Sequence, residues 1–247
     1  FREIMDLLGE TDGLRFCAHY GITPKGNFEG RSVPNLLHAP EQDDAIESLL
    51  PKLYEYRKSR TALHTDRKQL TAWNALTAAA YATAARILKN EGYLSSARET
   101  VDFIEKNLTD GDTVFVSVTE AKRSCPGFLD DYAFYIFALI QMHQASLNET
   151  YLNRAAELTR KVLRSFWDEE GGGFYFSGAE NETLISRPKE SWDGAMPSGN
   201  SMMAYALSRL SLLTEDEQFL DWEKSQSQFM DGEAAVYPEG YGFYLYA

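Results

Sequence analysis

The chain has 247 residues, of which 44% are hydrophobic and 25% charged, and its formal net charge at pH 7 is −13. This composition is typical of a folded globular protein, and the acidic balance argues against nucleic acids and anionic membrane surfaces as partners. The longest apolar run, 75–85, contains polar residues and is shorter than the ~20 residues that a membrane helix needs.

In chain order, residues 1–60 predict short helices around a long loop. The pattern over 1–19 predicts two short helices, and 20–40 predicts a loop because it is rich in Gly and Pro. Residues 41–60 predict a helix with an acidic first turn and a basic last turn, which Pro51 kinks or restarts. Because the sequence begins with neither an initiator Met nor a signal-peptide profile, we expect it to begin within a longer protein.

Three helical hairpins are predicted after this region. The first helix of each hairpin is apolar nearly all round, as helices buried on most sides are; these are 70–88, 131–142 and 201–213. The second helix carries charges on one side, as surface helices do; these are 94–108, 151–166 and 215–229. Short β-like pieces are predicted at 114–118 and 174–176, the latter paired with 183–185. Since each first helix follows a polar, turn-rich motif, we expect these motifs to meet at one rim.

The predicted fold class is all-α, in a single domain over 1–247. Its hairpins are expected at 61–110, 111–167 and 168–231, with 1–60 as a leading region. Cys17 and Cys125 belong to no CxxC or Cys/His pattern, so neither a disulfide framework nor a zinc site is expected. A reducing compartment is therefore indicated, and we expect a cytoplasmic protein.

Several motifs carry a resemblance to a known family. They are Asn27-Phe28-Glu29-Gly30, Leu70-Thr71-Ala72-Trp73-Asn74, 126–134 (PGFLDDYAF), 166–174 (FWDEEGGGF), 187–190 (RPKE), 193–195 (DGA) and 197–201 (PSGNS). In this order and spacing they resemble the YyaL / spermatogenesis-associated protein 20 family, over nearly the whole chain. The sequence departs from the family pattern at Arg67, where a second acidic residue is expected after Asp66, and at Ala75, where Gly is expected.

The resemblance implies a thioredoxin-like domain followed by an (α/α)6 toroid of the six-hairpin glycosidase and sugar 2-epimerase type. This chain would be the later part of that toroid only, with short β-hairpins in its rim loops. The flanks of the first and last hairpins would then be exposed. We therefore expect the missing N-terminal part of the same protein as a partner, or a dimer of this fragment.

Acidic residues at the expected rim are the first candidates for catalysis. Asp130 and Asp131 begin a buried helix, where burial and like charge push carboxyl pKa values apart; the alternative is that Asp130 is the N-cap and Asp131 stabilises the first turn. Glu190 and Asp193 lie in a loop beside Arg187, Lys189 and Trp192, which together suit a sugar ring and its hydroxyls. The alternative there is an exposed ion pair of little energetic weight.

Other rim candidates are contacts for a substrate. His64 is a candidate general base or a structural His, and Trp73 is a core residue or, less favoured, a sugar platform. Ser198 and Asn200 cap the third inner helix or, for Asn200, point into the cavity. The remaining candidate contacts are Asp66, Lys68, Asn74 and Tyr132.

These residues predict a carbohydrate-active domain that binds a small sugar-like molecule. It would be a hydrolase with two carboxylates roughly 6.5 to 9.5 Å apart, or an epimerase that uses His64. The alternative is a non-catalytic binding or scaffold domain serving a thioredoxin-like module. No cofactor and no required metal are predicted, because His64 and Asp66 lack a third ligand. Gly171-Gly172-Gly173 is expected to be a turn, after an acidic stretch 168–170 that is solvated or binds calcium.

Overall fold

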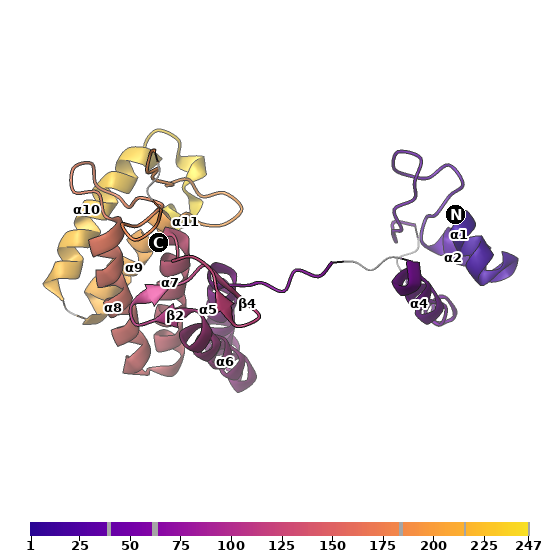
Figure 1. Ribbon diagram of the computed structural model, residues 1–247, viewed down its shortest axis with the longest axis horizontal. Coiled ribbons are helices and arrows are strands. Elements are labelled where there is room, and N and C mark those ends of the chain that lie inside the picture. Colours follow the sequence, from indigo (N-terminus) through magenta and orange to yellow (C-terminus); the bar gives the residue numbers. More distant parts are fainter. Residues whose placement is uncertain (39–40, 61–63, 183–184, 215, 247) are drawn as a thin grey trace. The chain divides into compact units, whose positions relative to one another are not determined.

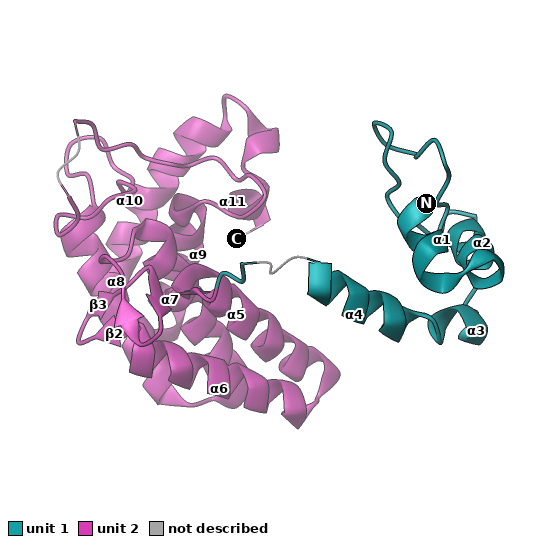
Figure 2. Cartoon of the chain, turned by 45° about the vertical axis from the view of Figure 1, so that its right-hand side comes forward, with its two compact units in different colours: residues 1–66 teal, residues 67–247 magenta. Residues whose placement is uncertain are grey.

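The structure, a computed structural model, describes residues 1–38, 41–60, 64–182, 185–214 and 216–246 (Figure 1). The chain divides into two compact units, Phe1–Asp66 and Arg67–Ala247 (Figure 2). Each unit has a hydrophobic core of its own, where the sequence predicts one domain over 1–247. That single-domain expectation stays a prediction. Within the described residues, no helix is long and apolar enough to cross a bilayer.

The described residues of the first unit form four helices around a small core. They are α1 (Arg2–Leu8), α2 (Glu10–His19), α3 (Asp44–Glu47) and α4 (Leu50–Arg60). The prediction of two helices within 1–19 is confirmed, as is the restart near Pro51, which is tolerated as the second residue of α4 because an N-terminal amide needs no intrahelical partner. The buried core consists of Phe16, Cys17, Ile22 and Ile46.

The second unit contains the three predicted helical hairpins. They are α5 (Thr71–Leu88) with α6 (Glu91–Asn107), α7 (Leu129–Ser146) with α8 (Glu149–Phe166), and α9 (Gly199–Thr214) with α10 (Glu217–Ala234). A 3-10 turn η1 (Pro238–Gly240) and a short helix α11 (Gly242–Tyr246) follow. The prediction of apolar first helices and charged second helices is confirmed for all three hairpins.

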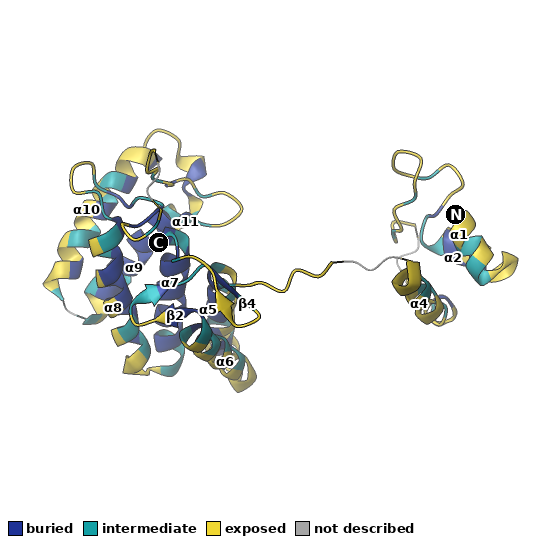
Figure 3. Cartoon of the chain, viewed as in Figure 1, coloured by how far each residue is buried: buried dark blue, intermediate teal, exposed yellow. Residues whose placement is uncertain are grey.

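Helix α7 is at the centre of this unit. It packs against α5 and α9, and each outer helix packs on the inner helix of its own hairpin. The large side chains of Phe134, Tyr135 and Leu139 are almost completely buried, whereas α8 is exposed along one side (Figure 3), where Arg160 and Arg164 lie, although its Lys161 is buried. The sequence pattern reflects this difference, because a helix with neighbours on most sides has no face left for charge.

The first two hairpins close on the same two-residue turn. Lys89 after α5 and Leu147 after α7 both have left-handed backbone, with φ of 52° and 55°. The next residue, Asn90 or Asn148, caps the outer helix by accepting a hydrogen bond from the backbone N–H two residues on. The inner helices therefore all begin at the other end of the hairpins, which we call the rim.

Short strands connect the rim loops to the start of α5. They are β1 (Gln69–Leu70), β2 (Thr109–Asp110), β3 (Thr113–Val114), β4 (Ser117–Thr119) and β5 (Lys122–Arg123). Antiparallel β1, β4 and β5 form one sheet, in the register Gln69 to Val118, and β2 pairs with β3. The predicted strand 114–118 is thus two strands. Phe174 pairs with Trp167; residues 183 and 184 of its predicted partner lie outside the described residues.

Candidate functional site

Asp131 joins the N-terminal ends of α5 and α7 at the rim. It is the third residue of α7, and its Oδ2 accepts a hydrogen bond of 3.0 Å from the backbone N–H of Phe128, the N-cap residue. The backbone of Ala72, the second residue of α5, donates to the same carboxylate. Only 5% of Asp131 is exposed. One buried carboxylate therefore satisfies amides from two helices, which otherwise lack intrahelical partners.

Burial raises the pKa of Asp131 to about 7, and the neighbouring charge of Asp130 acts in the same direction. The hydrogen bonds from Phe128 and Ala72 oppose this shift because they stabilise the ionised form. Burial outweighs these hydrogen bonds, since no basic side chain among the described residues pairs with Asp131 to offset the loss of water. The carboxyl group is therefore divided between its two protonation states near neutral pH.

Asp130 connects α7 to α9. The backbone N–H of Gly199, the first residue of α9, donates a hydrogen bond to its carboxylate. A Cβ atom at position 199 would lie 2.6 Å from Oδ1 of Asp130, so only glycine allows this approach. The alternative that Asp130 is the N-cap of its own helix is wrong, because α7 begins at Leu129 and Phe128 is its N-cap.

Asp130 also holds a proton more tightly than an ordinary carboxyl group. Burial raises its pKa to about 6, the negative charge of Glu190 adds to the rise, and the Gly199 hydrogen bond opposes it. Glu190 is exposed. The two carboxyl groups therefore interact electrostatically while differing in environment, one half-buried and one in contact with solvent, which is the arrangement that separates an acid from a base.

Asn200 fixes the backbone beside Glu190. Its side chain is fully buried; Nδ2 donates to the carbonyls of Glu190 and Phe174, both at 2.9 Å, and Oδ1 accepts from the N–H of Phe174 at 2.8 Å. Ser198 Oγ accepts from the N–H of Ser201 at 3.1 Å, which is the geometry of a helix cap. The structure supports the predicted capping for Ser198, whereas Asn200 neither caps the helix nor points into a cavity but holds the backbone of Phe174 and Glu190.

Asp193 accepts hydrogen bonds from three backbone amides. Its Oδ1 accepts from the N–H of Ser198 at 2.8 Å, and its Oδ2 accepts from Phe243 at 2.8 Å and Tyr244 at 3.2 Å. These amides lie before α9 and in the first turn of α11. Because three donors engage this carboxylate, its position supports a structural role better than the catalytic role predicted for it.

The two predicted cations of the loop are engaged as well. Arg187 donates to the carbonyl of Ser177 at 2.6 Å and lies 4.3 Å from the centroid of the Tyr175 ring. Lys189 pairs with Asp168 at 2.5 Å and donates to the carbonyl of Gly172. The alternative of an ion pair between Glu190 and either cation is therefore not what the structure shows.

Two tryptophans at the rim present aromatic surface. Trp73, in the first turn of α5, is 60% exposed, so the favoured expectation that it is a core residue is wrong. Trp192 is 53% exposed and stacks on Tyr237, with ring centroids 5.0 Å apart and planes at 11°. Tyr132, by contrast, is 1% exposed; burial raises its pKa to about 12, and its hydroxyl accepts from Val114. Its predicted contact with a substrate has no accessible surface.

The remaining predicted contacts are distributed between the two units. Asn74 donates to the carbonyl of Leu70 at 2.7 Å, within its own helix start. Lys68 is exposed and precedes β1. His64 and Asp66 are exposed and belong to the first unit, and their contact with a substrate stays a prediction.

Sequence reasoning missed the amides and the side chain that complete the rim. Nothing in the sequence marks Ala72 or Gly199 as donors to a distant carboxylate. Gln226, on the outer helix α10, is fully buried and donates to the carbonyl of Asn200 at 3.0 Å, while its Oε1 has no hydrogen-bond partner among the described residues. The charged pattern of α10 gave no signal for such a residue.

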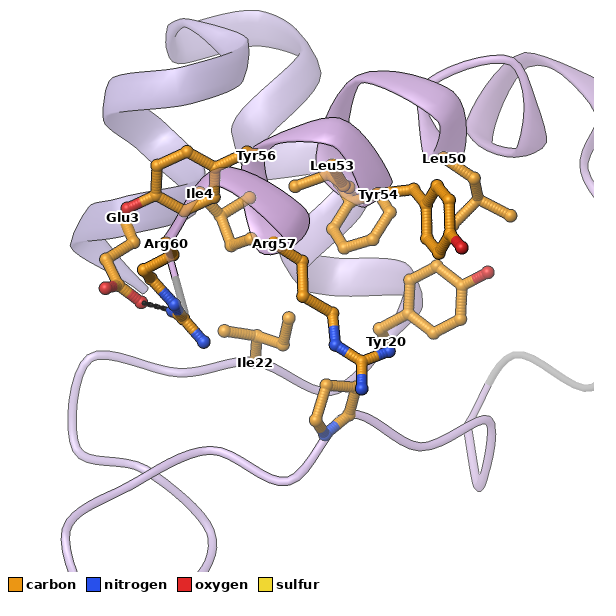
Figure 4. Close-up of a pocket in the computed structure, with 12 residues that line it drawn as sticks. Glu3, Ile4, Tyr20, Ile22, Leu50, Leu53, Tyr54, Tyr56, Arg57 and Arg60 are labelled. Carbon is orange, nitrogen blue, oxygen red and sulfur yellow. Dashed lines mark hydrogen bonds and ion pairs between the residues drawn. The ribbon is translucent and has the colours of Figure 1, made fainter. Parts of the chain in front are cut away.

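Two other hollows contain carboxyl groups of their own, including Asp168, Glu169 and Glu170 in the second of them. The first unit has an apolar cleft of about 500 Å³, in which Glu3 is paired with Arg60 at 3.0 Å (Figure 4). A polar hollow of about 560 Å³ lies beside Gly171 and Trp222. There, the hydrogen bond from Lys189 lowers the pKa of Asp168 to about 2. Among the described residues, no three His, Cys, Asp or Glu side chains form a group that could hold a metal ion.

Comparison with curated proteins gives the relatives of the chain. It is 30% identical over 262 aligned positions to spermatogenesis-associated protein 20 of Homo sapiens, and the match covers 89% of this chain and 33% of that protein. The proteins of the same name from Rattus norvegicus and Mus musculus match with the same identity and coverage. The chain is a relative of spermatogenesis-associated protein 20. The resemblance noted from the motifs is thereby confirmed, and the chain spans about a third of the length of these relatives. No family model matches.

Solved structures confirm the fold class, an all-α partial (α/α)6 toroid. Cellobiose 2-epimerase from Bacillus thermoamylovorans is similar with a TM-score of 0.56 and 20% identity, over 68% of this chain and 45% of that one. For a family 76 glycoside hydrolase from Bacteroides thetaiotaomicron the TM-score is 0.59 and the identity 15%, and the match covers 78% of this chain and 43% of that one. For a family 105 glycoside hydrolase from C. acetobutylicum the TM-score is 0.56 and the identity 16%, and the match covers 76% of this chain and 57% of that one. At these identities the likeness shows the fold alone.

Proposed function

We propose that the chain belongs to a carbohydrate-active toroid that hydrolyses a glycosidic bond, with Asp130 as general acid and Glu190 as general base. The proposal depends on one observation, the half-buried Asp130, whose pKa is raised to about 6 beside the exposed carboxylate of Glu190, so that a proton can be held there more readily than on an ordinary aspartate. Asp130 would protonate the glycosidic oxygen that leaves, and Glu190 would take a proton from the water that attacks the anomeric carbon. The glycoside hydrolases named above share this fold, which is therefore compatible with this reaction class.

Hydrolysis is favoured over epimerisation by the residues at the rim. Epimerisation needs a base beside a carbonyl, and none of the rim residues described above for the second unit is a histidine. The exposed rings of Trp73 and Trp192 are suitable faces for a pyranose, and Asn74 remains a proposed contact beside Trp73. Asp131 and Asp193 are proposed as positioning residues, because backbone amides engage both carboxylates.

The test is hydrolysis of a panel of oligosaccharides by the full-length protein, with the release of reducing ends as the measurement. Asp130→Asn and Glu190→Gln should each lower kcat by about 10² or more. The matched control is Glu99→Gln, an exposed acid on α6, which should retain wild-type activity. No turnover of any glycan, together with activity of the same protein in a thiol–disulfide exchange assay, would favour the scaffold alternative.

We also propose that the N-terminal part of the same protein covers the outer flank of α5, and that the isolated chain dimerises through it. Leu76, Ala80 and Ile87 line an apolar groove there together with Phe137 of α7, and Ile87 is 68% exposed. Light scattering should give twice the 27.9 kDa of one chain, and Ile87→Glu should restore the monomer. A monomeric wild-type chain at high concentration would contradict the dimer.

A cytoplasmic location is proposed on the two cysteines, both of which are free. Fractionation of cells that express the full-length protein tests it, and recovery with secreted or membrane fractions would contradict it.

A further inference from the structure

We infer that the rim accepts an uncharged glycan and discriminates against sugars that carry a carboxylate or a phosphate. This inference rests on the proposed function, because it names the substrate class for the same site. It is drawn from the hydrogen bonds and ion pairs that the charged side chains and amides of the rim make within the chain.

The amides that would bind an anion are occupied by the chain's own carboxylates. Helix N-termini bind phosphate and carboxylate groups because their first amides lack intrahelical partners. At this rim Asp131 takes the amides of Phe128 and Ala72, and Asp130 takes that of Gly199. Asp193 takes those of Ser198, Phe243 and Tyr244. A ligand anion would have to displace a protein carboxylate to reach these donors.

The cations that flank Glu190 are occupied too. Lys189 donates to Asp168 and to the carbonyl of Gly172, and Arg187 is held by carbonyl oxygens and the Tyr175 ring. In the described part of the second unit, the segment before β1 adds Arg67 and Lys68, which are both exposed, and Lys68 has an interaction of its own. Arg67 is therefore the cation to test if an acidic sugar binds.

What the rim presents to a ligand is negative charge and aromatic surface. An anion beside Glu190 would add a third charge to the pair that it forms with Asp130 and would be repelled by both. A neutral ring would instead stack on Trp73 or Trp192 and donate hydroxyl hydrogens to the same carboxylates. The charge that repels an acidic sugar thus helps to bind a neutral one.

The experiment is isothermal titration of the full-length protein at pH 7.5 with two matched pairs of probes. They are methyl β-glucoside against methyl β-glucuronide, and mannose against mannose 6-phosphate. We expect the neutral member of each pair to bind about tenfold more tightly or better, as repulsion by one nearby charge at intermediate dielectric implies. Acidic members that bind as tightly as the neutral ones would overturn the inference; loss of their binding in Arg67→Ala would then identify the cation responsible.

Variants separate the local charge from the net charge of the protein. Asp130→Asn removes one of the two negative charges of Asp130 and Glu190 and keeps an oxygen for the Gly199 amide. It should therefore reduce the ratio of affinities for the neutral and the acidic sugar, as should 1 M NaCl. Glu99→Gln removes the same charge on α6 and should leave the preference unchanged; an equal effect of both variants would overturn the local origin. If no sugar of either kind binds, the proposed function fails together with the inference; if acidic sugars bind and turn over, only the inference fails.

Discussion

Aspartates cap helices in both compact units, but the direction of their pKa shifts is opposite. In the first unit Asp43 caps α3 by accepting from Ala45 and Ile46, and it pairs with Arg15 at 2.9 Å. Burial acts to raise its pKa, but the hydrogen bonds from Ile46 and Arg15 outweigh burial and the net shift is downward.

In the second unit Asp130 and Asp131 also accept hydrogen bonds from amides at helix starts, but their pKa values are raised instead, to about 6 and about 7. Burial against the core around α7 raises these pKa values by more than the hydrogen bonds lower them. An aspartate that caps a helix is therefore not a proton donor for that reason alone. The extent of the core below the cap and the absence of a counter-ion decide whether the group keeps its proton.

Removing part of the core below Asp130 and Asp131 should reduce stability most. Phe134→Ala should lower the free energy of unfolding of the second unit by about 3–5 kcal/mol, because this ring is completely buried in α7. All four tryptophans lie in the second unit, so the midpoint of denaturation followed by their fluorescence measures it.

The matched change in the first unit is Ile46→Ala, at a residue that is 1% exposed. It should reduce amide-exchange protection in 1–60 and leave the tryptophan transition unchanged. If either variant shifts both measurements equally, the two units unfold as one domain, and the single-domain expectation holds.

A smaller effect is expected from Asp131→Asn. A native pKa above the unfolded value means that the folded state binds more protons between about pH 4 and pH 7, so wild-type stability falls as the pH rises through this window. The variant lacks this titration. Between pH 5 and pH 8 the wild type should therefore lose roughly 2 kcal/mol of unfolding free energy that the variant keeps.

Urea denaturation at the two pH values measures this difference. A direct check is the backbone amide of Ala72 in ¹⁵N spectra, whose chemical shift should titrate near pH 7 in the wild type and not in the variant. A flat titration at Ala72 in the wild type would contradict the shared hydrogen bond.

The smallest effect on stability, with the opposite dependence on pH, is expected for Asp43→Asn. Because the pKa of Asp43 is lowered, its ionised form stabilises the first unit above the unfolded value of about 4, and this contribution is lost as the pH falls through the folded pKa. The variant should be less stable than the wild type at pH 7, and the difference should shrink as the pH falls below about 4. Amide exchange within α3 and α4 measures it, and a gap that widens toward low pH would contradict the comparison.

The helical architecture could be predicted from sequence because the outer and inner helices differ in pattern. The range 70–88 predicts α5 to within one residue, and 151–166 predicts α8 to within two. The inner helices α7 and α9 begin two residues before the predicted starts, at Leu129 and Gly199, because backbone groups of the preceding loop take part in the caps.

The candidate site could be predicted only in part. Two acidic residues at the start of an apolar helix gave Asp130 and Asp131, but which other helix each one reaches depends on tertiary packing. Asp193 and Trp73 show that the environment of a side chain does not follow from its sequence context alone. A loop acid that was a catalytic candidate is held by three amides, while an aromatic residue in an apolar helix is exposed.

The tight turns after α5 and α7 and the long segments at the opposite end have different tolerance for insertions. Each turn has two residues, one left-handed and one Asn that caps the next helix, so an added residue would break both. The much longer connections 108–128 and 167–198 are not tied to one turn geometry over most of their described residues, so they tolerate insertions better. Related proteins can thus change the loops at the rim, and with them the bound ligand, while the helices keep their register. Insertions and deletions that differ between relatives should therefore be found mainly at the rim.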